Sequence, residues 1–490
     1  MQQPEYIISA EIGSSAVKIA AAESKGPGTP LNILAVTSEP ISSGVRYGRI
    51  QNVEDVTTAT MLALQTLIDN PALSGRKIVG VYAGIGGRSL ASISVSARLT
   101  LPDEQEITAE IIERLKEDAL ADVPTDVEPL EIIPVSFTID GIKANRPVGS
   151  YGTSISADFT IVVCDPINAR NIERVIVKKL NLDICGYVVR PLAVAKLALT
   201  VHDTKPGVML ADIGAETTTV SIFKGGSLRY LATIPMGSRN ITRDLAQGLG
   251  IIEEKAEDIK RRLGNAMPDQ TADSAEQTEI DNYVQARAAE IVANIVAHIG
   301  FSGLTTADLR SGIVVTGRGA KLRNLCQLLK QQSQLEVRIA TLPAQIRIAD
   351  PLINSADNLD IIASAVVGSA YASAPDAIPC TVETETEAAP EEESDDDSLD
   401  KNDSIEIDTT PVHNGQRNVD DEDLLIDDDE AERRAYERER DKAERERKKA
   451  EEKAADKIRD KNSNIFSKIR SSITRMVNSA DTGDGNDLDD

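Results

Sequence analysis

The chain has no tryptophan, and aromatic residues make up only 3% of its 490 residues. Its core must therefore rest on Ile, Val, Leu and Ala, because hydrophobic residues still amount to 41% of the chain. That composition favours helices and buried β-branched strands. The scarcity of aromatics leaves no base-stacking surface, and a net charge of −26 opposes contact with a phosphate backbone. We therefore expect no nucleic-acid partner.

Cysteine is also scarce, and long apolar runs are missing. Four cysteines are widely spaced without a CxxC pair, and only three histidines could join them at a metal. This pattern is typical of free thiols in a reducing compartment. No run of about 18 apolar residues occurs, and the start "MQQPEYIISAEIG" lacks the basic and apolar parts of a signal peptide. We expect a cytoplasmic protein that does not span a membrane.

Short Val- and Ile-rich strands alternate with helical patterns up to about Tyr371. Examples of strands are "YIISAEI", "GVMLADI" and "GIVVTG", and "NARNIERVIVKKL" and "ITRDLAQGLG" have the period of helices. Alternation of this kind indicates an α/β architecture with parallel or mixed sheets. The length predicts about three domains.

The composition changes abruptly after this region. Residues 377–430 are rich in acids and poor in apolar side chains, so we expect a disordered linker. Residues 431–461 carry opposite charges three or four positions apart, which predicts a solvated helix about 45 Å long. An amphipathic helix is expected over 462–479, followed by an acidic tail over 480–490.

The stretch "NIFSKIRSSITRMVN" within 462–479 separates apolar from basic side chains. On a helical wheel the apolar residues fall within an arc of about 120°; they are Ile465, Phe466, Ile469, Ile473, Met476 and Val477. The basic residues that flank or lie beyond this arc are Lys468, Arg470 and Arg475. Such a helix docks on protein or lies on an anionic membrane surface, and the basic flank favours the membrane.

Two glycine-containing turns follow strands that look buried. In "SAEIGSSAVKIAAAE", Gly13 lets the backbone approach an anion, while Ser14, Ser15 and Lys18 can contact phosphate oxygens. The alternative is an ordinary β-hairpin. In "GVMLADIGAETTTVSIFKGGSL", Asp212 could hold Mg²⁺ through water, and the turn at Gly214 and Thr217 could grip phosphate, or could close a second plain hairpin.

A third strand, in "SGIVVTGRGAKLRNL", runs into Gly317 and Gly319 before a helix, where small residues let a nucleotide lie on the chain. The sequence has no GxxxxGK[ST], so a P-loop NTPase is not indicated. The order of the three turns resembles that of the actin, hexokinase and Hsp70 superfamily. Within it, the chain resembles the FtsA family of bacterial cell division most.

This narrower resemblance rests on further stretches between about Glu5 and Tyr371. They are "ISSGVRYGRIQNVEDVTTAT", "IDGIKANRPVGSYGTSISADFTIV", "NIERVIVKKLNLDICGYVVRPLAVAKLALT", "GGSLRYLATIPMGSRNITRDLAQGLG" and "KAEDIKRRLG". The resemblance implies a two-lobed actin-like ATPase fold with an inserted FtsA-type subdomain. The first lobe would comprise 1–82 with 164–204 and 345–376, the insert 83–163 and the second lobe 205–344.

ATP and Mg²⁺ are the cofactors that the resemblance implies, bound in the cleft between the lobes. The residues expected to face the phosphates are Gly13, Ser14, Ser15, Lys18, Asp212, Gly214 and Thr217. Those expected near the ribose or adenine are Glu257, Lys260, Gly317 and Gly319. Glu11 and Asp212 would hold the magnesium ion through water.

The second turn departs from the family pattern of glycines followed by Thr and, two residues on, Asp. Ala215, Glu216 and Thr219 stand at three of those positions. Glu216 would bring a carboxylate near the phosphates unless a metal or an arginine offsets it, and the missing Asp removes a group that could orient water. Arg318 replaces a glycine of the adenosine turn. We expect ATP binding with at most slow hydrolysis.

The resemblance also implies partners. A family member docks the C-terminal tail of the tubulin-like protein FtsZ, and Arg287 in "IDNYVQARAAEIV" matches an arginine of that contact. By the same resemblance, this chain would polymerise with itself and bind an anionic membrane surface. It would meet other divisome proteins at the septum, on the cytoplasmic face of the inner membrane. The alternatives are a pilus-assembly-type actin-like protein and a small-molecule kinase on the same fold.

Overall fold

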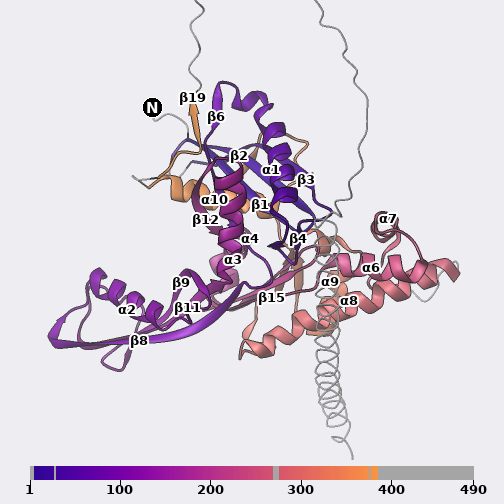
Figure 1. Cartoon of the computed structure of the whole chain (residues 1–490). Helices are drawn as coiled ribbons and strands as arrows, with labels where there is room; N and C mark the ends of the chain where they lie inside the picture. Colours follow the sequence, from indigo (N-terminus) through magenta and orange to yellow (C-terminus); the bar gives the residue numbers. More distant parts are fainter. Residues whose placement is uncertain (1–4, 27–28, 269–274, 375–376, 384–490) are drawn as a thin grey trace, which may run out of the picture. The chain divides into compact units, whose positions relative to one another are not determined.

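Two β-sheets organise the computed structural model, which describes residues 5–26, 29–268, 275–374 and 377–383 (Figure 1). All of these belong to one unit, Met1–Pro390. The charged helix, the amphipathic helix and the acidic tail expected after residue 430 lie outside the described residues. The mixture of helices and sheets confirms the α/β class.

The first sheet has six strands in the order β12-β7-β1-β2-β3-β18. Their bounds are β1 Glu5–Ile12, β2 Ala16–Ser24, β3 Asn32–Pro40, β7 Gly80–Ile85, β12 Asp183–Val189 and β18 Arg347–Ile348. Strands β1, β2 and β3 pair antiparallel, whereas β7 pairs parallel with β1 and β12. Nearly every residue of β2 is buried, and successive side chains point to opposite faces, so both faces of this sheet are covered.

Helices α1 (Val53–Ile68) and α10 (Leu359–Ala372) both contact β2, and α10 also packs on α4 (Arg190–Ala198). The side chain of Asn52 caps α1, because its Oδ1 accepts the backbone N–H of Glu54 at 3.0 Å. The remaining short elements near this sheet are β4 Val45–Arg46, β5 Arg49–Ile50, α3 Pro166–Glu173 and a π-helical turn at Arg174–Lys179.

The start of the expected linker is ordered. Strand β19 (Thr381–Glu383) pairs antiparallel with β6 (Arg76–Ile78), and the buried Cys380 precedes it. The described chain therefore continues as a strand beside the first sheet up to Glu383.

The second sheet has nine strands in the order β10-β9-β11-β8-β15-β14-β13-β16-β17. Five belong to the second lobe, namely β13 Val208–Ile213, β14 Thr218–Lys224, β15 Ser227–Ile234, β16 Ile313–Thr316 and β17 Val337–Ile339. Four come from the inserted segment, namely β8 Ala91–Glu106, β9 Glu128–Ile139, β10 Ile142–Ala144 and β11 Tyr151–Cys164. Strand β8 of the insert pairs with β15 of the lobe at Ala91 and Ala232, and hydrogen bonds such as that from the N–H of Leu231 to Ser92 Oγ at 2.8 Å add to this junction.

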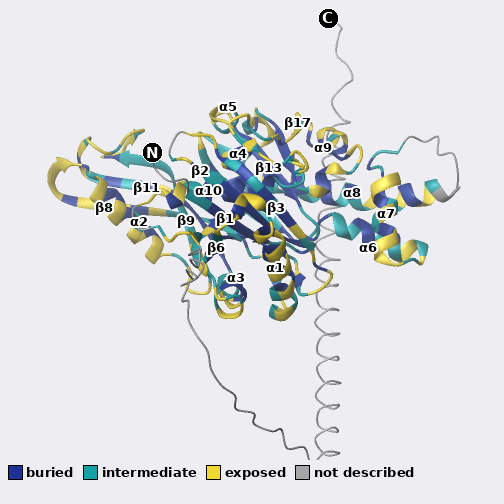
Figure 2. Ribbon diagram, turned by 90° about the horizontal axis from the view of Figure 1, so that it is seen from above, coloured by how far each residue is buried: buried dark blue, intermediate teal, exposed yellow. Residues whose placement is uncertain are grey.

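Helices of the second lobe gather beside its strands (Figure 2). They are α6 Ser238–Leu249, α7 Glu253–Leu263, α8 Ala275–Phe301 and α9 Leu325–Ser333, and the short helix α5 (Val201–Thr204) precedes the first strand of this lobe. Helix α2 (Ala109–Ala121) packs on β8 of the insert. Gly250, in the left-handed conformation at φ 64°, ends α6. None of the helices in the described ranges is long and apolar enough to cross a bilayer.

Candidate functional site

Two turns of the same geometry lie on one cleft. Between β1 and β2, the N–H of Gly13 donates to the carbonyl of Ala16 at 3.0 Å. Between β13 and β14, the N–H of Gly214 donates to the carbonyl of Thr217 at 2.8 Å. A Cβ at either glycine would lie 3.1 or 3.0 Å from the oxygen that its own N–H contacts. The tightness of each turn therefore explains why glycine stands there.

The cleft has about 900 Å³ of empty volume, part of it open to solvent. It brings together most of the site residues that the sequence predicts: Glu11, Gly13, Ser14, Ser15, Lys18, Asp212, Gly214, Thr217 and Gly317. Gly319 does not line it but lies against Ile213, whose Cγ2 would be 2.4 Å from an added Cβ. The roles assigned to these residues stay predictions.

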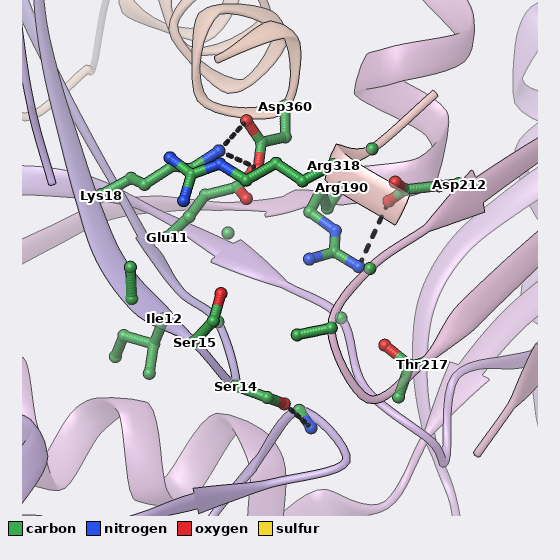
Figure 3. A pocket seen from close by; sticks show the side chains of 18 of the residues that line it. Glu11, Ile12, Ser14, Ser15, Lys18, Arg190, Asp212, Thr217, Arg318 and Asp360 are labelled. Atoms are coloured by element: carbon green, nitrogen blue, oxygen red, sulfur yellow. Dashed lines mark hydrogen bonds and ion pairs between the residues drawn. The ribbon is translucent and has the colours of Figure 1, made fainter. Parts of the chain in front are cut away.

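Lys18 forms an ion pair with a carboxylate. Its Nζ lies 2.7 and 2.8 Å from the two carboxylate oxygens of Asp360 and donates to the carbonyl of Asp357 at 2.7 Å (Figure 3). Burial on its own raises the pKa of Asp360, but the charge and hydrogen bonds of Lys18 outweigh it and hold that pKa below the ordinary value. Lys18 therefore joins the first sheet to α10 as well as lining the cleft.

A second buried ion pair lies beside the first. Arg190 Nη2 is 3.4 Å from Asp212 Oδ2, and Arg190 Nε is a buried donor without a hydrogen-bond partner in the described structure (Figure 3). Burial raises the pKa of Asp212, although Arg190 opposes the shift. Asp212 is thus held by a guanidinium that retains an unused donor.

Glu11 is a buried acid of the cleft with a strongly shifted pKa. Burial, together with the nearby charge of Asp360, raises the pKa of Glu11 to about 7. The hydroxyl of Ser364 donates to Glu11 Oε1 at 2.6 Å. Glycine at position 84 makes room for this carboxylate, since a Cβ there would lie 2.9 Å from Glu11 Cγ.

Two arginines offset the negative charge of the Glu216 carboxylate, as the sequence predicts for an acid beside a phosphate-binding turn. Its Oε1 lies 2.7 Å from Arg243 Nη2 and 3.5 Å from Arg239 Nη1, both on α6. Its Oε2 accepts the backbone N–H of Tyr47, on the first-lobe turn between β4 and β5, at 2.7 Å. Arg239 Nη1 also donates to the carbonyl of Ser14 at 3.0 Å. The Glu216 side chain is 2% exposed, so the second turn carries a neutralised, buried carboxylate that contacts both lobes.

Arg318 differs from the other cations of the cleft. Among the described residues that line it, Lys18 and Arg190 are paired with carboxylates, whereas Arg318 forms no ion pair. Its exposed side chain reaches into the cleft (Figure 3). An anion that enters this cleft can therefore meet Arg318 without breaking an existing pair.

The structure does not bring Glu257 and Lys260 into the cleft lining. Both lie on α7, where Lys260 Nζ is 2.6 Å from Glu257 Oε2 and donates to Thr242 Oγ1 at 2.9 Å and to the carbonyl of Ser238 at 3.1 Å. Burial lowers the pKa of Lys260, against the effect of Glu257. These contacts hold α7 to α6, and their expected role at a ribose or adenine stays a prediction.

Arg287 lies on α8, away from the cleft lining. Its Nε and Nη2 contact the carboxylate of Asp244 on α6 at 2.6 and 3.0 Å, and its Nη1 is 2.5 Å from Glu290. An open pocket beside it is lined by Asp244, Gln247, Gly248, Tyr283 and Ala286. Hydrogen bonds therefore fix the guanidinium at the edge of a surface hollow.

Sequence reasoning missed Asp360, Arg190, Arg239 and Arg243. Asp360 lies in the first turn of α10, 342 positions from Lys18 in the chain, so no local spacing connects the two. The sequence could have indicated Arg190, because it is a charged residue directly after the apolar strand β12. A charged side chain that is buried there needs an oppositely charged or hydrogen-bonding partner.

The two sheets and the cleft place the chain in the actin-like superfamily. A solved structure of a PilM–PilN type IV pilus biogenesis complex matches 75% of this chain and 99% of its own, with a TM-score of 0.52 and 16% identity. That likeness concerns the fold. Family models give the narrower answer, because residues 209–374 match the model for cell division protein FtsA and residues 87–163 match the SHS2 domain inserted in FtsA.

Curated relatives agree with these models. Cell division protein FtsA of Bacillus subtilis is 27% identical over 72% of this chain and 82% of its own length. FtsA of Pseudomonas aeruginosa is 27% identical over 69% of this chain and 84% of its own length. The chain belongs to the FtsA family of cell-division proteins.

Proposed function

We propose that this chain is a nucleotide-binding, actin-like adaptor that polymerises and anchors FtsZ filaments to the cytoplasmic face of the membrane at the division site. The observation that carries the proposal is the pair of matched glycine turns on one cleft, in a chain of the FtsA family. A bound nucleotide supplies a ligand that both turns can hold at once.

The donors in the cleft fit a nucleoside phosphate. Within the described structure, the hydroxyls of Ser15 and Thr217 make no hydrogen bond, and Arg190 Nε is buried without a partner. Arg318 adds a cation that no carboxylate holds. Unused donors on several elements that face one space are what an anionic ligand requires. A nucleoside phosphate is the ligand we propose, and ATP is the one that the family resemblance implies.

Magnesium would enter with the nucleotide. No group of three His, Cys, Asp or Glu residues in the part of the chain that the structure describes could hold a metal ion. Mg²⁺ is commonly bound through one or two carboxylates together with substrate phosphates and water. Asp212, and Glu11 when ionised, would contact the waters of that ion.

We propose at most slow hydrolysis. Thr219 replaces the Asp of the family pattern, and its hydroxyl lies 3.1 Å from the hydroxyl of Thr233 on β15, outside the cleft lining. The carboxylate of Glu216 accepts hydrogen bonds from Tyr47 and Arg243, so it is not free to orient a water molecule. The cleft is therefore better suited to holding a nucleotide than to cleaving it.

Membrane attachment is proposed from the sequence of residues 462–479. Partial burial of its apolar side chains contributes about 6 to 9 kcal/mol before ordering costs. Each nearby Lys or Arg adds about 1 kcal/mol on an anionic leaflet. One copy would bind weakly, and polymerisation would make the attachment firm through avidity. The acidic linker would keep the folded unit away from the lipid.

The proposed FtsZ contact is tested on Arg287. We expect the intact chain to bind a fluorescent peptide of the FtsZ C-terminal tail, and Arg287→Glu to weaken binding at least about tenfold, because it places a third acid beside Asp244 and Glu290. Fluorescence anisotropy measures the affinity, and Arg287→Ala provides a variant without the added charge.

Arg261→Glu is the matched control, since Arg261 is an exposed residue on α7 of the same lobe. It should bind the peptide as the native chain does. Native affinity in both Arg287 variants, with the fold retained by circular dichroism, would contradict the proposed contact.

The pilus-assembly alternative shares the fold, as the PilM–PilN match shows. The family models favour cell division, because both the second lobe and the insert match FtsA. No observation on the cleft favours a small-molecule kinase.

A further inference from the structure

Glu216 stands at the junction of the two glycine turns. It lines the cleft together with Ser14, Gly214 and Thr217. Arg239 connects it to the first turn, since one guanidinium nitrogen lies 3.5 Å from Glu216 Oε1 and 3.0 Å from the carbonyl of Ser14. The carboxylate therefore lies in the cleft lining and is connected to both turns.

The groups around the Glu216 carboxylate form an anion-binding set. Tyr47 and Gly48 are the two central residues of the turn between β4 and β5, and both have positive φ, 51° and 72°. A turn of this type aims successive backbone N–H groups in one direction. The N–H of Tyr47 donates to Glu216 at 2.7 Å, and the N–H of Gly48 donates to Ser14 Oγ at 2.9 Å. Tyrosine is unusual at positive φ, so this geometry is kept against a conformational cost.

Two arginines complete the set. Arg243 Nη2 lies 2.7 Å from Glu216 Oε1, and Arg239 approaches the same oxygen. Two guanidinium groups and a backbone N–H are the donors with which proteins hold phosphate. In this chain a carboxylate of the protein itself already uses them.

We propose that Glu216 is a specificity-determining residue that makes the cleft select nucleoside diphosphates over nucleoside triphosphates. This inference rests on the proposed nucleotide site. A terminal phosphate that reached the junction of the turns would compete with Glu216 for Arg239, Arg243 and the Tyr47 N–H. It would also bring an additional negative charge close to a buried carboxylate, which a diphosphate does not.

The test compares the dissociation constants of Mg·ADP and Mg·ATP for the full chain by isothermal titration calorimetry. We expect the native chain to bind ADP about tenfold more tightly than ATP. Glu216→Gln removes the charge but keeps an oxygen for the Tyr47 N–H, and Glu216→Gly restores the residue of the family pattern. Both should move the ADP:ATP affinity ratio toward ATP by about fivefold or more, with the larger change in Glu216→Gly because it frees both arginines.

Glu253→Gln is the matched control. Glu253 is the second carboxylate on Arg243, at 3.4 Å, but it is half-exposed and does not line the cleft. The ratio should stay at the native value in this variant. An ATP preference in the native chain, or an unchanged ratio in Glu216→Gln, would overturn the inference while leaving the nucleotide site standing. Failure of the native chain to bind either nucleotide would overturn the proposed site and the inference with it.

Discussion

At the scale of single residues, the cleft is a set of buried charges held in pairs. Lys18 pairs with Asp360 and Arg190 with Asp212, while Glu11 has a hydrogen bond from Ser364 but no ion pair with any residue that the structure describes. Glu11 therefore differs from its neighbours, because its charged form is poorly compensated in a buried place. Its pKa of about 7 makes the stability of the chain depend on pH near neutrality.

The pH dependence has a definite sign. A carboxyl with a pKa of about 7 in the folded chain and 4.5 in the unfolded chain binds its proton more tightly when folded. Its contribution to stability is full below pH 4.5 and is lost as the pH rises to and through 7. We expect the free energy of unfolding to fall by on the order of 2 kcal/mol between pH 5 and pH 8 from this group alone.

Glu11→Gln should remove that part of the slope while keeping an oxygen for Ser364. Urea unfolding of both proteins at pH 5 and pH 8 isolates the contribution, because other titrating groups cancel in the comparison. The same pH slope in both proteins would show that Glu11 does not titrate as described.

At the scale of secondary-structure elements, the sequence predicted the two turn-bearing hairpins well, since each lies within one continuous stretch. It could not predict what the turns touch. The Glu216 contact with Tyr47 spans 169 positions, and that of Arg239 with Ser14 spans 225. Contacts of this kind depend on how the sheets are placed, which local patterns do not encode. The order in strand β19, within the expected linker, was missed for the same reason, because its partner β6 lies about 300 residues earlier in the chain.

The turn after β16 gives an element-scale prediction. Gly317 has φ 84°, and a Cβ there would lie 2.4 Å from the carbonyl oxygen of Ile213 and 2.6 Å from Asp212 Oδ1. Gly317→Ala should lower the free energy of unfolding by about 2 kcal/mol or more through strain and clash. Gly226→Ala is the control, because Gly226 has φ 85° with nothing within 4 Å, so only about 1 kcal/mol is expected there. If urea unfolding shows that both variants lose the same free energy of unfolding, the close approach of position 317 to Asp212 does not destabilise the alanine variant.

At the scale of the whole molecule, we propose that different segments of the chain have different tasks. The FtsA-type unit holds the cleft for which we propose nucleotide binding and the Arg287 surface for which we propose FtsZ binding. For residues 462–479 we propose lipid contact. The fold class and much of the cleft lining followed from the sequence, because glycine turns and alternating strands are local signals. The arginines that neutralise Glu216 and the partner of Lys18 did not, because they are products of the tertiary fold.

The proposed function requires that the chain carries FtsZ to a membrane. Sedimentation of FtsZ filaments with anionic phospholipid vesicles tests this, in the presence of the full chain or of a chain that ends at Lys461. We predict that FtsZ pellets with the vesicles only when the full chain is present, and that the shortened chain leaves FtsZ unattached to lipid. Equal recovery of FtsZ on the vesicles with both chains, or none with the full chain, would contradict the proposed function.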